Sequence, residues 1–337
     1  TSVQETDQAM TANDTFDASN PFYSASTLPL QYPAFDQITT DHYLPAFERG
    51  MVEHIEEIAV IVNQVEDPTF ENTMLPLEES GELLNRVATV FFAMSSAHTN
   101  DDINEIEVEI APKLSTHQDR IFLDAGLFAR VQDLYERRDA LGLDAESVRL
   151  IEENYKDFVR AGAQLGGEQK EQLKAINLEL AELSTSFSQN VLEEVNAKAI
   201  VVDSAEELAG LTEAQIQTAA DAAESRDMLG KYVIPLLNTS GQPWLSSLEN
   251  RALRQRIHET SLSRGHSGGE FDNREILSRT ANLRAIKSSL LGFNNHAEYI
   301  LQNQTAQTVS AVNQRLADLT PPAIANARRE AADLQAA

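Results

Sequence analysis

Apolar side chains recur every three or four residues along most of the chain, a spacing that places them on one face of an α-helix. The first such stretch is 41–66, for which Asp41 is the expected N-cap residue. Pro76 is compatible with the second helix only if it lies in the first turn. The helices predicted in this way span 41–66, 73–97, 101–122, 125–139, 145–165, 168–196, 212–226, 248–263, 272–291, 294–303 and 308–335. Capping or breaking residues introduce several of them, namely Asp101, Asp124, Asp144 and the pair Gly166-Gly167.

Two short stretches depart from the helical pattern. AKAIVVD (197–203) and KYVIPLL (231–237) are rich in β-branched residues, and turn residues follow the second of them. We predict that they form two strands of a small sheet, with helix 212–226 between them. Glycine (14 residues) and proline (11 residues) are too scarce for an all-β protein with many tight turns. The expected fold class is therefore mainly α, with a small β element near residues 197–240.

The chain divides into three expected parts. Residues 1–20 are polar and predict a flexible tail, followed by an extended, proline-rich arm at 20–38. Residues 21–196 form the expected N-terminal helical lobe, and 197–337 hold the β element and the later helices. The chain begins with Thr1, and its last helix is still amphipathic where the sequence stops, which predicts a fragment of a longer protein. The tail is typical either of a tether behind a removed export signal or of a terminus without a role.

The composition limits the possible partners. Lys and Arg total 26 and Asp and Glu total 53, which gives a net charge of −27. Such a surface repels nucleic acid and anionic lipid, so neither is expected as a partner. No apolar stretch approaches the length of a membrane span. The absence of cysteine suits a cytosolic protein and equally an envelope protein that folds without disulfides.

The stretch HETSL (258–262) begins like H-E-x-x-H, in which two histidines one helical turn apart bind zinc. Leu262 occupies the place of the second histidine, and none of the seven histidines has another histidine four residues later. The helix containing HETSL is expected to pack through Leu248, Ala252, Ile257 and Ser261. We interpret HETSL as a chance match in a structural helix, with Leu262 as a packing or boundary residue.

Other metal-binding patterns are equally weak. His98 and Asp102 are four residues apart, as are His266 and Glu270, but the first pair falls at a helix junction and the second in a loop. We expect surface polar contacts in both places. No other group offers three nitrogen or oxygen ligands at a recognisable spacing.

No signature of nucleophilic catalysis or phosphate binding is present. The sequence contains no G-x-S-x-G, no Walker loop and no G-x-G-x-x-G, and its many paired carboxylates do not single out a general acid or base. The Gly-rich stretch RGHSGGEF (264–271) is interpreted as a flexible connection between helices. A basic island could bind an anion or pair with acidic helices of the same chain, and pairing is favoured. This island comprises Arg251, Arg254, Arg256, Arg264, Arg274, Arg279, Arg284 and Lys287.

Longer segments carry a family resemblance. The chain from about residue 20 to its end resembles the thimet-oligopeptidase (M3) family of zinc peptidases, and within it the bacterial peptidyl-dipeptidases more than the oligopeptidases A. The segments that carry the resemblance include PTFENTMLPLEESGELLNRVATVFFAMSSAHTND (68–101), DFVRAGAQL (157–165), LSTSFSQNVLEE (183–194), LAGLTEAQI (208–216), KYVIPLLNTSGQP (231–243), FDNREIL (271–277), LLGFNNHAEYILQNQTAQT (290–308) and ANARREAADLQA (325–336).

The resemblance implies the N-terminal half of an α-rich clamshell peptidase with a deep, narrow channel. In that family zinc is held by H-E-x-x-H and a later Glu, and the expected activity is removal of C-terminal dipeptides from short unfolded peptides. These elements match no position here, so no catalytic, cofactor-binding or metal residue is assigned, and the zinc ligands are expected beyond residue 337. This chain would form one wall of the channel, pair with its own C-terminal catalytic half and be inactive alone.

The resemblance also implies a bacterial protein, for which the polar tail indicates the periplasm or cell envelope, with the cytoplasm as the alternative. The competing function is a stand-alone helical scaffold or binding protein derived from the peptidase lobe.

Overall fold

The computed structural model describes residues 16–237 and 242–337, and helices make up most of both ranges. The predicted tail, residues 1–20, lies largely outside the described residues. The α-helices are α1 (Tyr43–Val62), α2 (Leu75–Glu79), α3 (Glu82–Ala97), α4 (Asp101–Phe122), α5 (Ala125–Arg137), α6 (Ala145–Ala161), α7 (Gly167–Ala197), α8 (Glu213–Glu224), α9 (Arg251–Leu262), α10 (Arg274–Leu290), α11 (His296–Leu301) and α12 (Val309–Ala336). Short helical turns lie at η1 (Pro29–Gln31), η2 (Thr40–His42), η3 (Phe70–Met74), η4 (Arg138–Ala140), η5 (Ala205–Leu208) and η6 (Pro243–Ser246). The mainly α fold class is confirmed.

The small β element is also confirmed. Strand β1 (Ile200–Val202) pairs antiparallel with β2 (Tyr232–Ile234), and Val201 lies opposite Val233. Helix α8 connects the two strands, as the sequence predicted. The sheet and its flanking helices α8 and α9 bury their own apolar cluster, which includes Leu208 and Ile257. This element therefore does not depend on the larger helical cores for its packing.

Two predictions at the start of the helical region were wrong. Asp41 does not cap α1: it lies inside the turn η2, where Thr39 and His42 form the capping box. The predicted helix 73–97 is divided in two, because Ser80 is extended and Gly81 has φ +73°, a left-handed conformation that favours glycine. Pro76 lies in the first turn of α2, as expected.

Capping residues explain where later helices begin. Asp124 and Asp144 accept hydrogen bonds from the backbone N–H groups of Leu127 and Ser147, and so cap α5 and α6 as predicted. The cap of α4 is Asn100 rather than Asp101, because the Asn100 side chain accepts from the N–H of Ile103. Asp101 lies in the first turn, where its charge suits the helix dipole.

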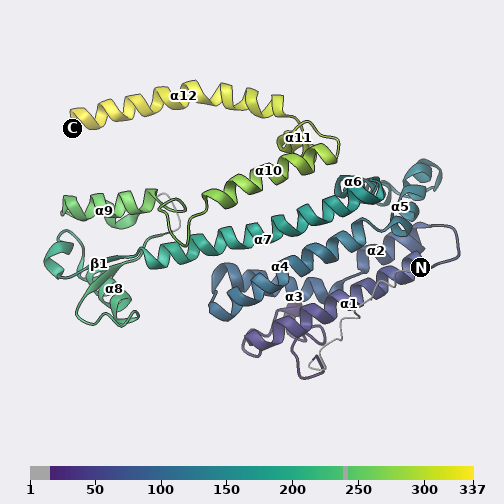
Figure 1. Ribbon diagram of the computed structural model, residues 1–337, viewed down its shortest axis with the longest axis horizontal. Helices are drawn as coiled ribbons and strands as arrows, with labels where there is room; N and C mark the ends of the chain where they lie inside the picture. The colour runs from purple at the N-terminus through teal and green to yellow at the C-terminus, as the bar shows by residue number, and fades with distance from the viewer. Residues whose placement is uncertain (1–15, 238–241) are drawn as a thin grey trace, which may run out of the picture.

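Four long helices, α1, α4, α7 and α10, lie beside one another in sequence order, with α3 against α1 (Figure 1). Helix α7 runs antiparallel to α4, since Gln189 donates to the carbonyl of Asn104 and Asn177 donates to Asp119 near its other end. On its opposite side, α7 is tied to α10 by the Arg279–Glu179 ion pair. The 31 residues of α7 thus connect the early helices to the later part of the chain.

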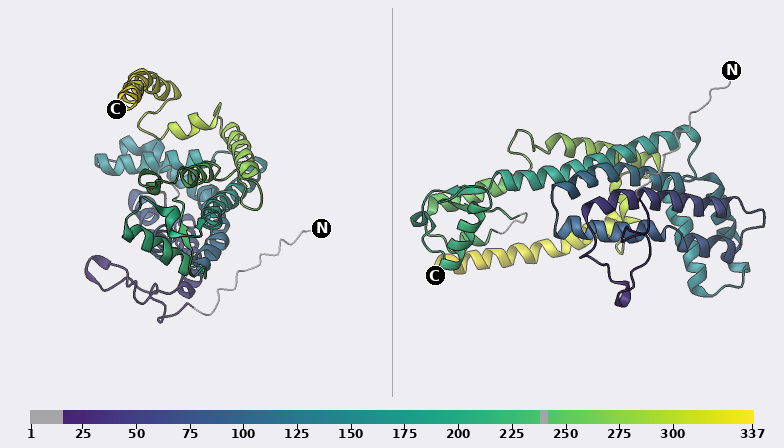
Figure 2. Two further views of the ribbon diagram at one scale, coloured as in Figure 1. Left: turned by 90° about the vertical axis from the view of Figure 1, so that its left-hand side faces the viewer. Right: turned by 90° about the horizontal axis from the view of Figure 1, so that it is seen from below.

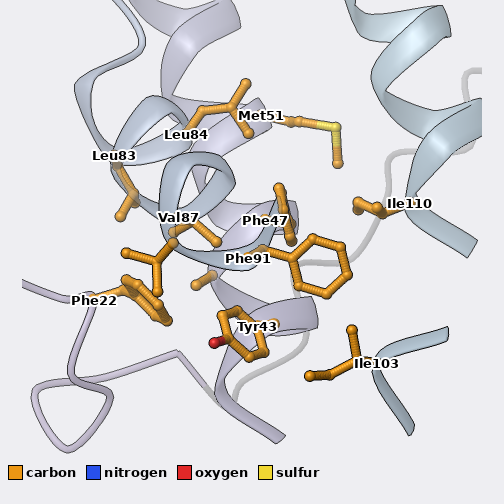
Figure 3. Packing of buried hydrophobic residues seen from close by; sticks show 12 residues of the cluster. Phe22, Tyr43, Phe47, Met51, Leu83, Leu84, Val87, Phe91, Ile103 and Ile110 are labelled. Atoms are coloured by element: carbon orange, nitrogen blue, oxygen red, sulfur yellow. The ribbon is translucent and has the colours of Figure 1, made fainter. Parts of the chain in front are cut away.

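The first hydrophobic cluster joins α1, α3 and the beginning of α4 (Figure 3). Phe91 is fully buried and meets both Tyr43 and Phe47 edge-on, with ring centroids 5.1 and 5.3 Å apart. Phe22, from the proline-rich arm, packs on the same cluster and is only 2% exposed. A second cluster joins the ends of α1 and α4 to α5 and α6.

Helix α12 has no buried residue in the described chain, and it extends away from the packed helices (Figures 1 and 2). Its larger apolar side chains, Leu316, Leu319, Ile324 and Leu334, are between 45% and 80% exposed. None of the described helices combines the length and the apolar character that a membrane crossing requires.

Candidate functional site

Two histidines from different helices meet beside the first hydrophobic cluster. His54 of α1 and His117 of α4 approach to 3.0 Å between Nδ1 and Nε2, and their ring centroids are 5.0 Å apart. His117 is only 7% exposed. On its other side, Nε2 of His54 lies 3.2 Å from the Ser80 hydroxyl oxygen. Ser80, His54 and His117 thus form a continuous row of polar contacts across α1 and α4.

The Ser80 hydroxyl determines the direction of these hydrogen bonds. It donates its proton to the carbonyl of Leu77 at 2.7 Å, so its oxygen is left to accept from Nε2–H of His54. A neutral His54 that carries its proton on Nε2 has a free lone pair on Nδ1. His117 must then donate from Nε2 to that lone pair. The row therefore requires a neutral His54 and a His117 that carries a proton on Nε2.

The surroundings of the two rings favour the neutral forms. Burial lowers the pKa of His54, although the nearby Glu57 carboxylate opposes this effect. For His117, burial, the neighbouring His54 and the Arg120 guanidinium lower the pKa to about 4. The lowered pKa of His54 agrees with the hydrogen-bond directions, because a second proton on its Nδ1 would face the N–H of His117.

The order of contacts in the row, from a hydroxyl to an imidazole to a second polar group, resembles that of a catalytic triad. The donor and acceptor roles do not match those of a triad. A general base needs a free lone pair on the nitrogen that faces the hydroxyl, whereas His54 Nε2 is a donor here. The adjacent Gly81 N–H is already used, since it donates to Glu57 at 2.7 Å, and so it is not available to an oxyanion. The geometry does not support nucleophilic catalysis by Ser80.

The row also does not form a metal site. Zinc in proteins takes three or four protein ligands, and the pair supplies two nitrogens. Within 16–237 and 242–337, no three His, Asp or Glu side chains lie close enough together to hold a metal ion. The residues present therefore do not fit the zinc that the family resemblance implies. The assignment of no metal residue to this chain stays a prediction.

A groove lies next to the histidine pair, with α4 as its floor and α1 and α7 as its walls. It consists of two cavities of about 310 and 450 Å³ that both touch Thr116, Arg120 and Leu178. Half of the side chains that line the first cavity are apolar, and His117 forms part of its wall. The other lining residues are Glu48, Met51, Val52, Ile55, Pro112 and Lys113 in the first cavity, and Asp119, Glu171, Lys174 and Ala175 in the second.

Buried polar contacts fix the helices that form this groove. The Asn177 amide donates to the Asp119 carboxylate at 2.7 Å and accepts from Lys287 at 2.6 Å, which joins α4, α7 and α10. Burial lowers the pKa of Lys287 and raises that of Asp119, and the two opposite charges partly offset these shifts. The groove thus has walls held in place by a polar network rather than by loops.

HETSL lies far along the chain from this groove, in α9 and at its end. His258 and Glu259 are exposed, and Glu259 accepts a hydrogen bond from Gln255. Leu262 is the last residue of α9 and 64% exposed, so it is a boundary residue and not a packing residue. Leu248 and Ile257 are buried as expected, but the exposed Ala252 is not on the packing side.

The structure does not bring the other candidate pairs together: neither His98 with Asp102 nor His266 with Glu270 shares a hydrogen bond in the described residues. The Gly-rich stretch does connect two helices, α9 and α10. It is nevertheless anchored, because the buried Glu194 accepts from Gly265 N–H and from the Ser267 hydroxyl. The expected flexible connection is therefore an anchored loop.

The basic island divides into several kinds of contact. Arg279 pairs with Glu179 of the acidic face of α7, and Arg274 pairs with Asp272. Arg254 and Arg256 instead donate to backbone carbonyls, at Leu248 and at Val201. Pairing with an acidic helix, the favoured alternative, is found for Arg279, whereas Arg274 pairs with a loop residue and the other two arginines contact backbone oxygens.

The sequence search missed the histidine pair for a simple reason. His54 and His117 are 63 residues apart and belong to different helices, whereas the search tested partners one turn away on the same helix. No spacing of residues within one helix predicts a contact between two different helices. The only available signal was that both residues lie beside the apolar stripes of their helices, which places them near a packed interface.

The comparisons with known proteins agree with the resemblance seen in the sequence. Residues 244–337 match the family model described as Peptidase family M3. The chain is 41% identical over 317 residues to the dipeptidyl carboxypeptidase of Escherichia coli, which covers 94% of this chain and 46% of that protein. It is 40% identical to the protein of the same name from Salmonella typhimurium, covering 94% of this chain and 47% of the relative.

Similarity to oligopeptidase A is lower. The Escherichia coli protein of that name is 27% identical over 312 residues, which covers 91% of this chain and 46% of the relative. The chain thus spans about half the length of the relatives it matches. Similarity that covers nearly all of this chain but only half of each relative leaves the other half of those proteins without a counterpart here.

Proposed function

Because this chain is related to the peptidases of family M3, we propose that it forms the non-catalytic N-terminal part of a peptidyl-dipeptidase, an enzyme that removes C-terminal dipeptides from short peptides. The observation that carries the proposal is the 41% identity to a dipeptidyl carboxypeptidase, against 27% to an oligopeptidase A. The higher identity supports a peptidyl-dipeptidase specificity over that of an oligopeptidase A.

In this proposal the chain contributes shape and charge rather than a reacting group. The packed layer of α1, α4, α7 and α10 supplies a rigid wall for a peptide channel, which excludes folded proteins and holds an extended peptide in place. In this proposal the zinc ligands belong to the rest of the enzyme, and no group of three His, Asp or Glu side chains that could hold a metal ion is found among the described residues. No catalytic step is therefore assigned to a side chain of this protein.

We propose the same division of the chain as the sequence suggested, with a helical lobe at 21–196 and a second part at 197–337. The boundary coincides with the end of α7 at Ala197. Support comes from the separate apolar cluster of the β element. Limited proteolysis should cut first near 198–199, and a first cut inside α1 to α7 would contradict the division.

Peptide hydrolysis tests the functional proposal. The purified chain, with zinc added, should release no dipeptide from a short unstructured peptide, whereas a polypeptide that continues into H-E-x-x-H and a later Glu should do so and lose activity with a chelator. Replacing the motif glutamate by glutamine in the longer polypeptide is the matched control. Chelator-sensitive cleavage by this chain alone would overturn the proposal.

The reading frame offers a second, independent test. Continuation past Ala337 into H-E-x-x-H supports the enzyme, whereas a natural stop codon there supports the alternative of a helical scaffold without catalysis. We also propose a cell-envelope location from the polar composition of residues 1–20. Fractionation of the native host tests this location, and recovery in the cytoplasmic fraction would contradict it.

A further inference from the structure

One of the basic side chains that line the groove over α4 has no ion-pair partner among the described residues. Of the two lysines that line it, Lys113 contacts Glu48 at 2.7 Å and Glu109 at 2.6 Å, and Lys174 contacts Glu171 at 2.8 Å. Arg120 has no hydrogen-bond or ion-pair partner among the described residues. Its side chain is exposed and lies at the meeting point of the two cavities.

The position of Arg120 in the last turn of α4 explains only part of this arrangement. A cation near a helix C-terminus is stabilised by the helix dipole, with or without a ligand. The dipole does not explain the hollow on either side of the guanidinium. Pro112, Thr116 and Arg120 lie four residues apart on one face of α4, and this face is left uncovered between the two flanking helices.

The lining of the groove indicates the chemistry of an occupant. Side chains of Val52, Ile55 and Pro112 give the first cavity an apolar wall, and Ala175 and Leu178 do the same in the second. Each volume falls in the range of about 300–1,000 Å³ that is typical of small-molecule sites. An occupant would need one anionic group at the junction and an apolar arm on each side.

We propose that this groove binds a small carboxylate, whose carboxyl group is held by the Arg120 guanidinium and whose two apolar arms fill the adjoining cavities. N-acylated aliphatic amino acids have this shape: the acyl chain and the side chain flank the carboxylate. The planar guanidinium donates two parallel hydrogen bonds to a carboxylate, which a neutral amide does not match. The proposal does not rest on the proposed peptidase function and needs no metal.

An NMR titration with N-hexanoyl-leucine tests the proposal, with N-hexanoyl-leucinamide as the uncharged control. The acid should shift backbone signals of 48–55, 112–120 and 171–178 in a saturable way. Losing a charge-assisted hydrogen bond weakens binding by about tenfold or more, which is the expected difference between acid and amide. Saturable binding also raises the His117 pKa, because the bound carboxylate offsets the charge of Arg120.

Variants distinguish binding through the carboxylate from nonspecific hydrophobic binding. Arg120→Gln should weaken binding of the acid about tenfold and leave the amide unchanged. Arg251→Gln, at an exposed arginine of α9, is the matched control and should change neither affinity. Thr116→Phe places a ring where the cavities meet and should abolish binding of both probes, while unfolding temperatures confirm that each variant is folded.

Three results would overturn the proposal. One is equal affinity for acid and amide, which removes the role of the guanidinium. Another is an unchanged affinity in Arg120→Gln, and the third is the absence of saturable shifts in the groove up to the solubility of the acid. None of these outcomes depends on peptide hydrolysis, so the groove and the peptidase function stand or fall separately.

Discussion

Acidification from pH 7 to pH 5 should destabilise the fold through the His54–His117 pair. The His117 pKa is about 4 in the folded protein and has its usual value of 6.5 in the unfolded chain. Between these two values the unfolded state binds a proton that the native state does not bind. The free energy of unfolding is therefore fully retained above pH 6.5 and falls as the pH drops towards 4.

The two pKa values determine the size of this loss. Proton linkage for a single group gives about 2 kcal/mol between pH 7 and pH 5. Because His117 lines a groove that is open to water, screening reduces the expected loss to about 1 kcal/mol. His54 contributes in the same direction, since its pKa is also lowered.

Urea unfolding at pH 7, 6 and 5 measures the loss, with His117→Gln as the test variant. Glutamine retains an N–H donor for His54 but does not titrate, so its unfolding free energy should fall by about 1 kcal/mol less than that of the wild type. His98→Gln, at an exposed histidine, is the control and should follow the wild type. A His117 ring that titrates near 6.5 by NMR, or equal losses in wild type and His117→Gln, would refute the reasoning.

Three further substitutions test the packing. Gly50→Ala should destabilise the protein although alanine favours helices, because its Cβ would lie 2.9 Å from the Leu84 backbone. Gly167→Ala is the control: its Cβ would have no atom within 4 Å, so the change should be neutral or stabilising by up to about 1 kcal/mol. Urea unfolding measures both effects. Phe91→Ala should lower the unfolding free energy by about 3–5 kcal/mol in the same assay. Phe92→Ala is the comparison, because Phe92 is 39% exposed, and an equal loss in both variants would contradict the assigned core. Arg130→Lys should lower thermal stability by about 2 kcal/mol, because one ammonium cannot reach the Thr73, Asn72 and Glu66 oxygens that the buried guanidinium contacts; an unchanged unfolding temperature would contradict this.

Local signals were sufficient to predict most of the secondary structure. Asp124 and Asp144 are effective caps whatever the rest of the chain does, because each bonds to backbone within three residues. At the start of α4 the prediction failed because two neighbouring residues could each serve as the cap. Asn100 and Asp101 can both cap a helix, and only the folded chain shows that Asn100 does so. The break at Gly81 escaped notice because the apolar spacing continues through it.

The candidate site was out of reach of the sequence for a different reason. Its parts come from α1, α4 and α7, which the chain brings together only through tertiary packing. No sequence motif includes Arg120, and only the cavities beside it suggest a role in binding. Similarly, the tautomer of His54 follows from the Ser80 hydroxyl, which lies between α2 and α3 and donates to the Leu77 carbonyl of α2.

Asn177 links the groove to the part of the chain that matches the peptidase family model. Its amide nitrogen bonds to Asp119 beneath the groove, and its amide oxygen bonds to Lys287 of α10, within residues 244–337. An amide that donates on one side and accepts on the other cannot rotate without losing both contacts. Helix α7 is therefore held in one register against both neighbours. The groove and the family-matched segment are thus joined through one side chain of α7.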